Sequence, residues 1–269
     1  MEKQILKSAL IAMAGVGLLA SGAMALPFND RDTNIIPGSS NEITLQGLLD
    51  EAFESFGTET DTGINVRQDQ SSAAIWTPNE GDTSTYMISL ITSGIAGNLG
   101  IYSFSDPTKT YDFLAYDAAG DNFSQSFMIT LNGTFKSGTT SITGFGDAFG
   151  FYWKNGNSYQ YTEDDRNGTT PTARALAYQV ADGDTMALFG YIRQSDGTLK
   201  PSIDDGYGIT ASGNNDWILA FEDGTDMDFQ DAVFYIEDMT PVPEPGTMLL
   251  LGTGLAGLAA VGRRRKSRA

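Results

Sequence analysis

Short apolar runs separated by turn-forming residues are the feature that most restricts the fold of this chain. Between residues 73 and 237, ten runs of four to seven residues are rich in β-branched or aromatic side chains. Gly, Asn, Asp and Pro punctuate these runs, a pattern that predicts short β-strands joined by turns. The candidate strands are Ala73–Trp76, Tyr86–Ile91, Gly100–Phe104, Tyr111–Tyr116, Phe127–Leu131, Phe149–Lys154, Ala175–Val180, Met186–Ile192, Trp217–Phe221 and Ala232–Glu237.

One segment has helical spacing instead. Leu45, Leu48, Leu49, Ala52, Phe53 and Phe56 recur at intervals of three and four residues. This spacing predicts an amphipathic helix over Ile43–Phe56, which Gly57 would end.

Ten strands with one short N-terminal helix predict a mainly β fold, a β-sandwich with a jelly-roll-like arrangement. No internal repeat of fixed period occurs, so a solenoid is not expected. The glycine-rich stretch 137–150 is the best candidate seam. It divides the body into an N-terminal β-rich half, 26–144, and a C-terminal sandwich half, 145–238.

The 269 residues include neither cysteine nor histidine. Their absence removes disulfides, thiolate chemistry and every histidine-dependent catalytic triad. A glycosidase needs only two carboxylates, but nothing in the sequence marks one pair as lying across a cleft. We therefore predict no catalytic residues and a non-enzymatic protein, with a secreted hydrolase as the remaining enzymatic alternative.

The N-terminus has the three parts of a secretory signal peptide in the expected order. They are the basic Lys3 and Lys7, the apolar residues 9–20 and the small residues Ala23 and Ala25. We expect signal peptidase to remove residues 1–25 by cutting before Leu26.

The C-terminus combines a proline-rich linker, 239–245, with an apolar segment, 246–262, and a basic tail, 263–269. The 17 apolar residues would span about 26 Å as a helix, near the lower limit for a bilayer. The basic residues that would stop transfer and remain cytoplasmic are Arg263, Arg264, Arg265 and Lys266. We expect a transmembrane helix that holds the body outside the inner membrane.

Val242-Pro243-Glu244-Pro245, the apolar helix and the Arg-rich end together resemble the PEP-CTERM sorting signal of Gram-negative bacteria. The resemblance covers about the last 28 residues. It implies processing by an exosortase, a membrane-embedded enzyme, near Pro-Glu-Pro. The mature protein would then reside at the cell surface or in an exopolysaccharide biofilm matrix, and the helix would be a transient anchor.

Without its two ends, the body from 26 to 245 carries 33 acidic and nine basic residues, a net charge of −24. Such a surface repels polyanions, so we expect no nucleic-acid partner. It attracts divalent cations. Simple solubility would explain the charge equally well.

Five carboxylates gather just before the last predicted strand, at Glu222, Asp223, Asp226, Asp228 and Asp231. Close like charges repel one another, and Ca²⁺, which takes six to eight oxygen ligands in irregular geometry, would relieve that repulsion. The spacing is not that of an EF-hand. The alternative is a solvated acidic turn whose carboxylates cap backbone amides.

The same segment, Phe-Glu-Asp followed by Asp-x-Asp-Phe-x-Asp-Ala-Val-Phe, resembles the closing signature of a domain of unknown function in bacterial surface proteins and large adhesins. The resemblance extends over about 145–238 and implies calcium binding. Gln230 departs from it, because that family usually has Asn there, so the resemblance does not assign Gln230 as a ligand.

Tyr159 and Tyr161 alternate within a polar segment, so we expect them to form an exposed pair. They are the best candidates for stacking on sugars. Most other aromatic residues, including Trp76, Trp153 and Trp217, are expected in the β-core. Two functions remain: a structural surface or matrix protein, with Ca²⁺ as its expected stiffening ion, or a module that binds extracellular polysaccharide.

Overall fold

The computed structural model describes residues 44–54, 63–78, 84–92, 97–116, 124–130, 132–168, 173–193, 199–210, 213, 215–222 and 228–243. All of them except Pro243 belong to one compact unit, Asn29–Val242. The predicted signal peptide, transmembrane helix and basic tail lie outside the described residues. Within the described ranges, no helix is both long enough and apolar enough to cross a bilayer.

Within the described residues, the secondary structure is almost entirely β. The helices are α2 (Leu45–Glu54) and the 3-10 turn η2 (Asp164–Arg166). The strands are β1 (Gln70–Ser71), β2 (Trp76–Pro78), β3 (Ser84–Thr92), β4 (Gly97–Ser103), β5 (Thr110–Tyr116), β6 (Ser124–Ile129), β7 (Phe135–Ser137), β8 (Thr140–Ile142), β9 (Phe149–Asn155), β10 (Ser158–Tyr161), β11 (Ala175–Gln179), β12 (Thr185–Arg193), β13 (Leu199–Thr210), β14 (Trp217–Phe221), β15 (Ala232–Ile236) and β16 (Met239–Pro241).

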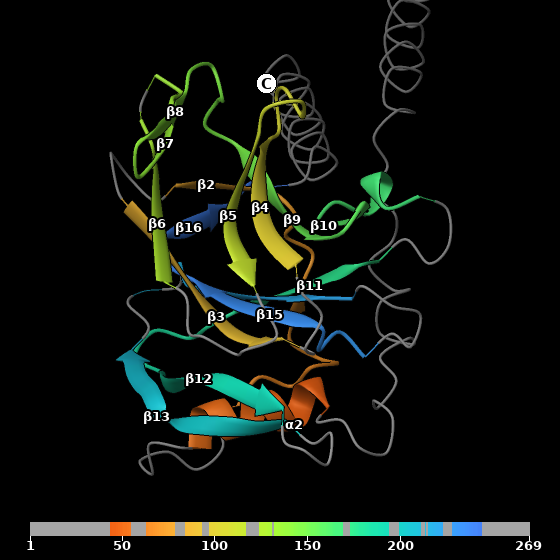
Figure 1. The fold of residues 1–269 in the computed structure, drawn as a ribbon, viewed down its shortest axis with the longest axis vertical. Helices are drawn as coiled ribbons and strands as arrows, with labels where there is room; N and C mark the ends of the chain where they lie inside the picture. Colours follow the sequence, from red (N-terminus) through yellow and green to blue (C-terminus); the bar gives the residue numbers. More distant parts are fainter. Residues whose placement is uncertain are drawn as a thin grey trace, which may run out of the picture. The chain divides into compact units, whose positions relative to one another are not determined.

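These strands form three antiparallel sheets (Figure 1). The largest has the order β1-β11-β14-β15-β3-β6-β7-β8. The second has the order β16-β2-β9-β4-β5, with β10 paired to β9. The third is the hairpin β12–β13, against which α2 lies.

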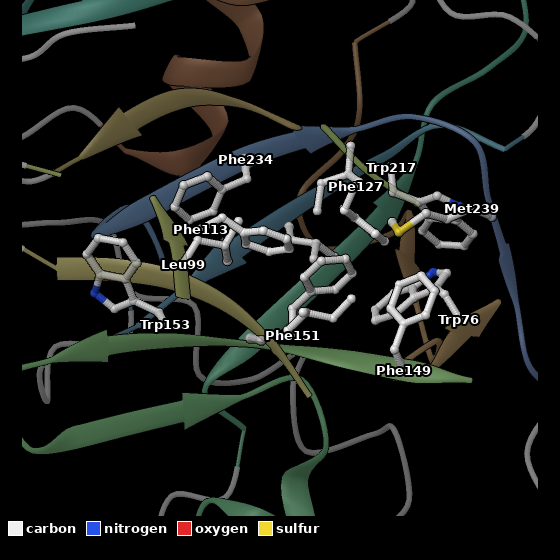
Figure 2. Close-up of a cluster of buried hydrophobic side chains, with 14 of the residues drawn as sticks. Trp76, Leu99, Phe113, Phe127, Phe149, Phe151, Trp153, Trp217, Phe234 and Met239 are labelled. Atoms are coloured by element: carbon white, nitrogen blue, oxygen red, sulfur yellow. Dashed lines mark hydrogen bonds between the residues drawn. The ribbon is translucent and has the colours of Figure 1, made fainter. Parts of the chain in front are cut away.

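The two larger sheets pack face to face around one aromatic core (Figure 2). Alternate residues of β9, Phe149, Phe151 and Trp153, point into this core, where Trp217 and Phe234 meet them from β14 and β15. Each buried side chain of this size contributes roughly 1.5–3 kcal/mol to folding. The predicted mainly β sandwich is therefore confirmed, and so is the prediction that the three tryptophans lie in the core.

The predicted helix is confirmed over Leu45–Glu54. The first predicted strand, Ala73–Trp76, is wrong except at Trp76, because the chain there passes from β1 in one sheet to β2 in the other. Strand β13, which includes Asp204 and Asp205, was not predicted.

The strands of the two predicted halves are interleaved. Strand β3, from the first half, lies between β15 and β6, and β9, from the second half, lies between β2 and β4. Residues 26–144 and 145–238 therefore contribute to both large sheets and share one core.

Candidate metal site and tyrosine surface

The acidic site lies at one end of the strand pair β14–β15. The last residue of β14, Phe221, pairs with the first residue of β15, Ala232. Glu222 follows β14 and Asp231 precedes β15, so the antiparallel pairing places both acids at the same end of the sheet. Asp228 lies close to both.

Glu222, Asp228 and Asp231 offer carboxylate oxygens that all lie within 4.8 Å of one another. The three side chains are 0%, 1% and 8% exposed, respectively. The structure therefore brings together three of the five predicted metal ligands. Asp223 and Asp226 lie outside the described residues. The three described acids are buried rather than solvated, whereas the backbone-amide capping expected of an acidic turn is present at Glu222 and Asp228.

The loop backbone is arranged around the carboxylates. The Phe229 amide donates to Glu222 Oε2 at 3.2 Å, and the Gln230 amide donates to Asp228 Oδ1 at 3.4 Å. Phe229 adopts a left-handed φ of 57°, a conformation that a bulky residue rarely takes. Its ring is fully buried, and this burial offsets the backbone strain.

Gln230 is the site residue that the sequence did not assign. Its side chain is 2% exposed, and its Nε2 donates to Asp228 Oδ2 at 3.1 Å. Its Oε1 is buried without a hydrogen-bond partner. A buried unpaired oxygen costs about 1–3 kcal/mol. The amide group that contacts Asp228 through its nitrogen therefore carries one unsatisfied acceptor.

The geometry is compatible with one shared cation. Two oxygens that each bind Ca²⁺ at roughly 2.4 Å lie at most about 4.8 Å apart. The three carboxylates meet this limit. Their oxygen-only chemistry suits a hard cation, and the chain has no thiolate or imidazole to offer a softer one.

A different acidic cluster lies at the opposite end of β14–β15. Asp216 is fully buried, and its two oxygens accept the Tyr235 hydroxyl at 2.9 Å and the Asp238 amide at 3.2 Å. Burial, and then the charges of Asp216 and Asp238, raise the pKa of Glu237 to about 7. The pKa of Asp238 is also raised, by burial and by Asp216.

Four tyrosines form a second feature, here called the tyrosine surface: Tyr102, Tyr152, Tyr159 and Tyr161. Tyr159 is 41% exposed, and its ring stacks on that of Tyr161 with centroids 5.9 Å apart and an interplanar angle of 12°. Tyr161 is only partly exposed, whereas the sequence predicted an exposed pair. Both rings contact the buried Tyr152, with centroids 5.4 and 5.8 Å away.

Ion pairs border the tyrosine surface. Lys154 Nζ lies 3.1 Å from Asp112 Oδ2 and 5.4 Å from the Tyr159 ring centroid. The Arg166 guanidinium pairs with Glu163 and lies 4.7 Å from the Tyr102 ring.

The buried tyrosines are anchored by hydroxyl bonds to these acids. Tyr102 donates to Glu163 at 2.7 Å, and Tyr152 donates to Asp112. Burial, followed by interactions with these carboxylates, raises the pKa of both hydroxyls well above the ordinary tyrosine value. They therefore remain neutral donors at physiological pH and hold the two rings in place.

Comparison with known families identifies the C-terminal segment. Residues 241–266 match the PEP-CTERM protein-sorting motif. The predicted sorting signal is therefore confirmed, and the motif marks the chain as an exported, exosortase-processed surface protein. Of the predicted motif residues, Val242 and Pro243 lie within the described part of the chain, whereas Glu244 and Pro245 lie outside it.

No match to this chain was found among the curated proteins. One similar solved structure is the Chromobacterium violaceum lectin CV2L in complex with alpha-methyl-fucoside. The alignment covers 64% of this chain and 100% of the lectin chain at 10% identity, with a TM-score of 0.30.

Proposed function

We propose that the β-sandwich is a non-enzymatic component of the cell surface or extracellular matrix, stabilised by a Ca²⁺ ion at Glu222, Asp228 and Asp231. The observation that carries the calcium proposal is the convergence of these three buried carboxylates within 4.8 Å. A second observation supports it: Gln230, whose amide nitrogen donates to Asp228, has a buried Oε1 without a hydrogen-bond partner.

Electrostatics favours a cation at this position. Bringing three carboxylates together in a buried place is unfavourable, because burial and mutual repulsion both penalise the charged forms. Protonation would relieve the repulsion, and so would a divalent cation, which attracts all three groups at neutral pH. The net charge of −24 on the body raises the local cation concentration further.

Calcium fits the loop better than magnesium does. Ca²⁺ accepts six to eight oxygens in irregular geometry, whereas Mg²⁺ requires near-ideal octahedral coordination and retains water. The three acidic residues and the Gln230 amide oxygen would supply side-chain ligands, and water or backbone oxygens would complete the shell. Sites in extracellular modules commonly have dissociation constants of roughly 0.1–1 mM.

A structural role agrees with the burial of the site. The carboxylates of Glu222 and Asp228 are at most 1% exposed, so a polymeric substrate has no direct access to them. A cation here would join the end of β14 to the start of β15 and fix the loop between them. We therefore assign the site to stability rather than to catalysis.

Calorimetric titration of the metal-stripped body with CaCl₂ tests the proposal. We expect one saturable site, with Mg²⁺ binding at least tenfold more weakly. Glu222→Gln and Asp228→Asn should each abolish the titration. Asp147→Asn, a change at an exposed acid, is the matched control and should leave it unchanged. Absence of binding to the wild-type body would refute the calcium site.

The tyrosine surface favours polysaccharide binding as a second candidate function. A partly exposed, parallel ring pair supported by anchored tyrosines provides a rigid platform for the apolar face of a sugar ring. The adjacent Lys154 and Arg166 are each paired with a carboxylate. Because the body is strongly anionic, this platform suits a neutral glycan better than an acidic one.

Retention on immobilised neutral and acidic polysaccharides separates the two functions. Tyr159→Ala should abolish any retention on a neutral glycan. Phe104→Ala is the matched control, because Phe104 is a similarly exposed aromatic residue, 43% against 41%. Equal loss of retention with both variants, or retention unaffected by Tyr159→Ala, would show that the tyrosine surface is not the glycan-binding site.

A further inference from the structure

The sorting motif overlaps the folded body. The motif begins at residue 241, but Pro241 is also the last residue of β16, which pairs with β2. The registered pairs are Met239 with Pro78, Thr240 with Thr77 and Pro241 with Trp76. The start of the processing signal is therefore part of a sheet.

Strand β16 is held by the core as well as by β2. Met239 is fully buried and lies beside Trp76 and Trp217 (Figure 2). Its carbonyl oxygen accepts the Trp217 indole N–H at 2.9 Å, and its amide donates to Asn215 at 2.8 Å. Removing this residue would open the core and leave a buried indole donor unpaired.

The attachment continues one residue beyond the strand. The Val242 amide donates to the Ile75 carbonyl oxygen at 2.9 Å. Its side chain packs against the cluster of Ile75, Tyr102 and Tyr152. Pro243, by contrast, is exposed. The boundary between attached and accessible chain therefore falls between Val242 and Pro243.

We infer that the exosortase cuts the chain on the C-terminal side of Pro243, so that β16 and the attached Val242 remain in the mature protein. A processing enzyme binds the residues around the scissile bond in its active site, so those residues cannot at the same time be paired or packed within the substrate's own fold. Cutting earlier would require β16 to leave the sandwich, with loss of the Met239 packing and the Trp217 hydrogen bond. This inference uses the sorting function and is independent of the calcium site.

The chemistry is cleavage of one peptide bond. Water adds across the C–N bond, leaving a carboxylate on the body and an amine on the released tail. If an amine acceptor takes the place of water, the body instead ends in a new amide. In either case the last residue that this chain contributes to the mature protein is the same. The experiment therefore has to identify that residue.

The test uses the full chain, expressed in a bacterium with its exosortase. Digestion of the mature protein on the N-terminal side of aspartate gives a terminal peptide that begins at Asp238. We expect fragmentation to show Pro243 or a later residue as the last residue of this chain. A mature C-terminus at Val242 or earlier would overturn the inference.

A pair of variants tests whether strand attachment sets the boundary. Met239→Asp places a charge in the core and should release β16, giving additional products that end before Val242. Thr240→Asp, at the exposed neighbouring position, should give the wild-type C-terminus. A folded Met239→Asp protein with an unchanged C-terminus would contradict the proposed role of β16.

Because Met239→Asp can also prevent folding, truncation provides an independent measurement. A body ending at Val242 should unfold at the temperature of one ending at Pro245. A body ending at Asp238 should unfold about 5–15 °C lower, from lost burial and an unpaired indole. Equal melting temperatures for all three would show that β16 is dispensable and would overturn the inference.

Discussion

The two ends of the β14–β15 strand pair both carry buried acidic residues, but the carboxylates are arranged differently at each end. At one end, Asp216 is surrounded by donors, accepting bonds from the Tyr235 hydroxyl and the Asp238 amide. At the other, Glu222, Asp228 and Asp231 converge with an unpaired amide oxygen beside them. Both arrangements supply protein donors to their carboxylates, but the second also brings three carboxylates within 4.8 Å of one another.

This difference shows that a count of acidic residues does not define a metal site. What matters is whether several carboxylate oxygens converge closely enough to share one cation. Glu237 and Asp238 add charge near Asp216, yet the effect is repulsion that raises their pKa values rather than a shared set of ligands.

Asp216→Ala should give the largest change, because it leaves the buried Tyr235 hydroxyl and the Asp238 amide without their acceptor. We expect a loss of about 2–5 kcal/mol in the free energy of unfolding, measured by urea denaturation. Any response to Ca²⁺ should persist in the folded variant. A loss below about 1 kcal/mol in the free energy of unfolding would show that the hydrogen bonds accepted by Asp216 do not stabilise this end of the strand pair.

Glu237→Gln should change the pH dependence of stability. The pKa of Glu237 is about 7 in the folded protein, against 4.5 for its ordinary value, so the folded state holds its proton more tightly. Stability from this group is therefore complete below pH 4.5 and is lost as the pH rises to 7. Asp238 acts in the same direction.

We expect Glu237→Gln to match the wild type near pH 4 and to be more stable at pH 8. Because the side chain is only half-buried, solvent screening limits the gain to about 1–2 kcal/mol. Urea denaturation across this pH range, with Asp147→Asn as the control, measures the difference. If the free energy of unfolding changed with pH in the same way for Glu237→Gln and wild type, repulsion of Glu237 by Asp216 and Asp238 would be excluded.

Tyr159→Ala should have the smallest effect on stability, below about 1 kcal/mol, because the side chain is 41% exposed. Tyr152→Ala should cost several times more, since that ring is buried under the pair and anchored to Asp112. Thermal unfolding of both variants measures this contrast. Similar losses would mean that Tyr159 is part of the core rather than an accessible platform.

The sequence predicts the sandwich because strands such as β9 and β14 consist of long runs of aromatic and aliphatic residues. It fails at β13, where Pro201, Gly206 and Gly208 indicate a turn and pairing with β12 overrides that preference. It also misses β16, in which only Met239 is apolar and the tertiary contacts with Trp217 and β2 are decisive.

The candidate sites likewise include residues that the sequence predicts and residues that only the tertiary structure identifies. Acidic spacing predicts Glu222, Asp228 and Asp231, because they flank the ends of two recognisable strands. Asp216 was missed, since it follows two asparagines in what reads as a turn, and burial is a tertiary property. Gln230 was not assigned as a ligand from the sequence, because the family that this segment resembles usually has Asn at that position. In the structure, the Gln230 amide contacts the Asp228 carboxylate.

The most direct test of the calcium site is thermal unfolding of residues 26–243, wild type and Asp228→Asn, in EDTA and in excess Ca²⁺. Calcium at a hundredfold excess over its dissociation constant should stabilise the wild type by roughly 2.7 kcal/mol. Asp228→Asn should equal or exceed the wild type in EDTA, because repulsion is relieved, and should gain nothing from Ca²⁺. A wild-type melting temperature that is the same in EDTA and Ca²⁺ would contradict the account.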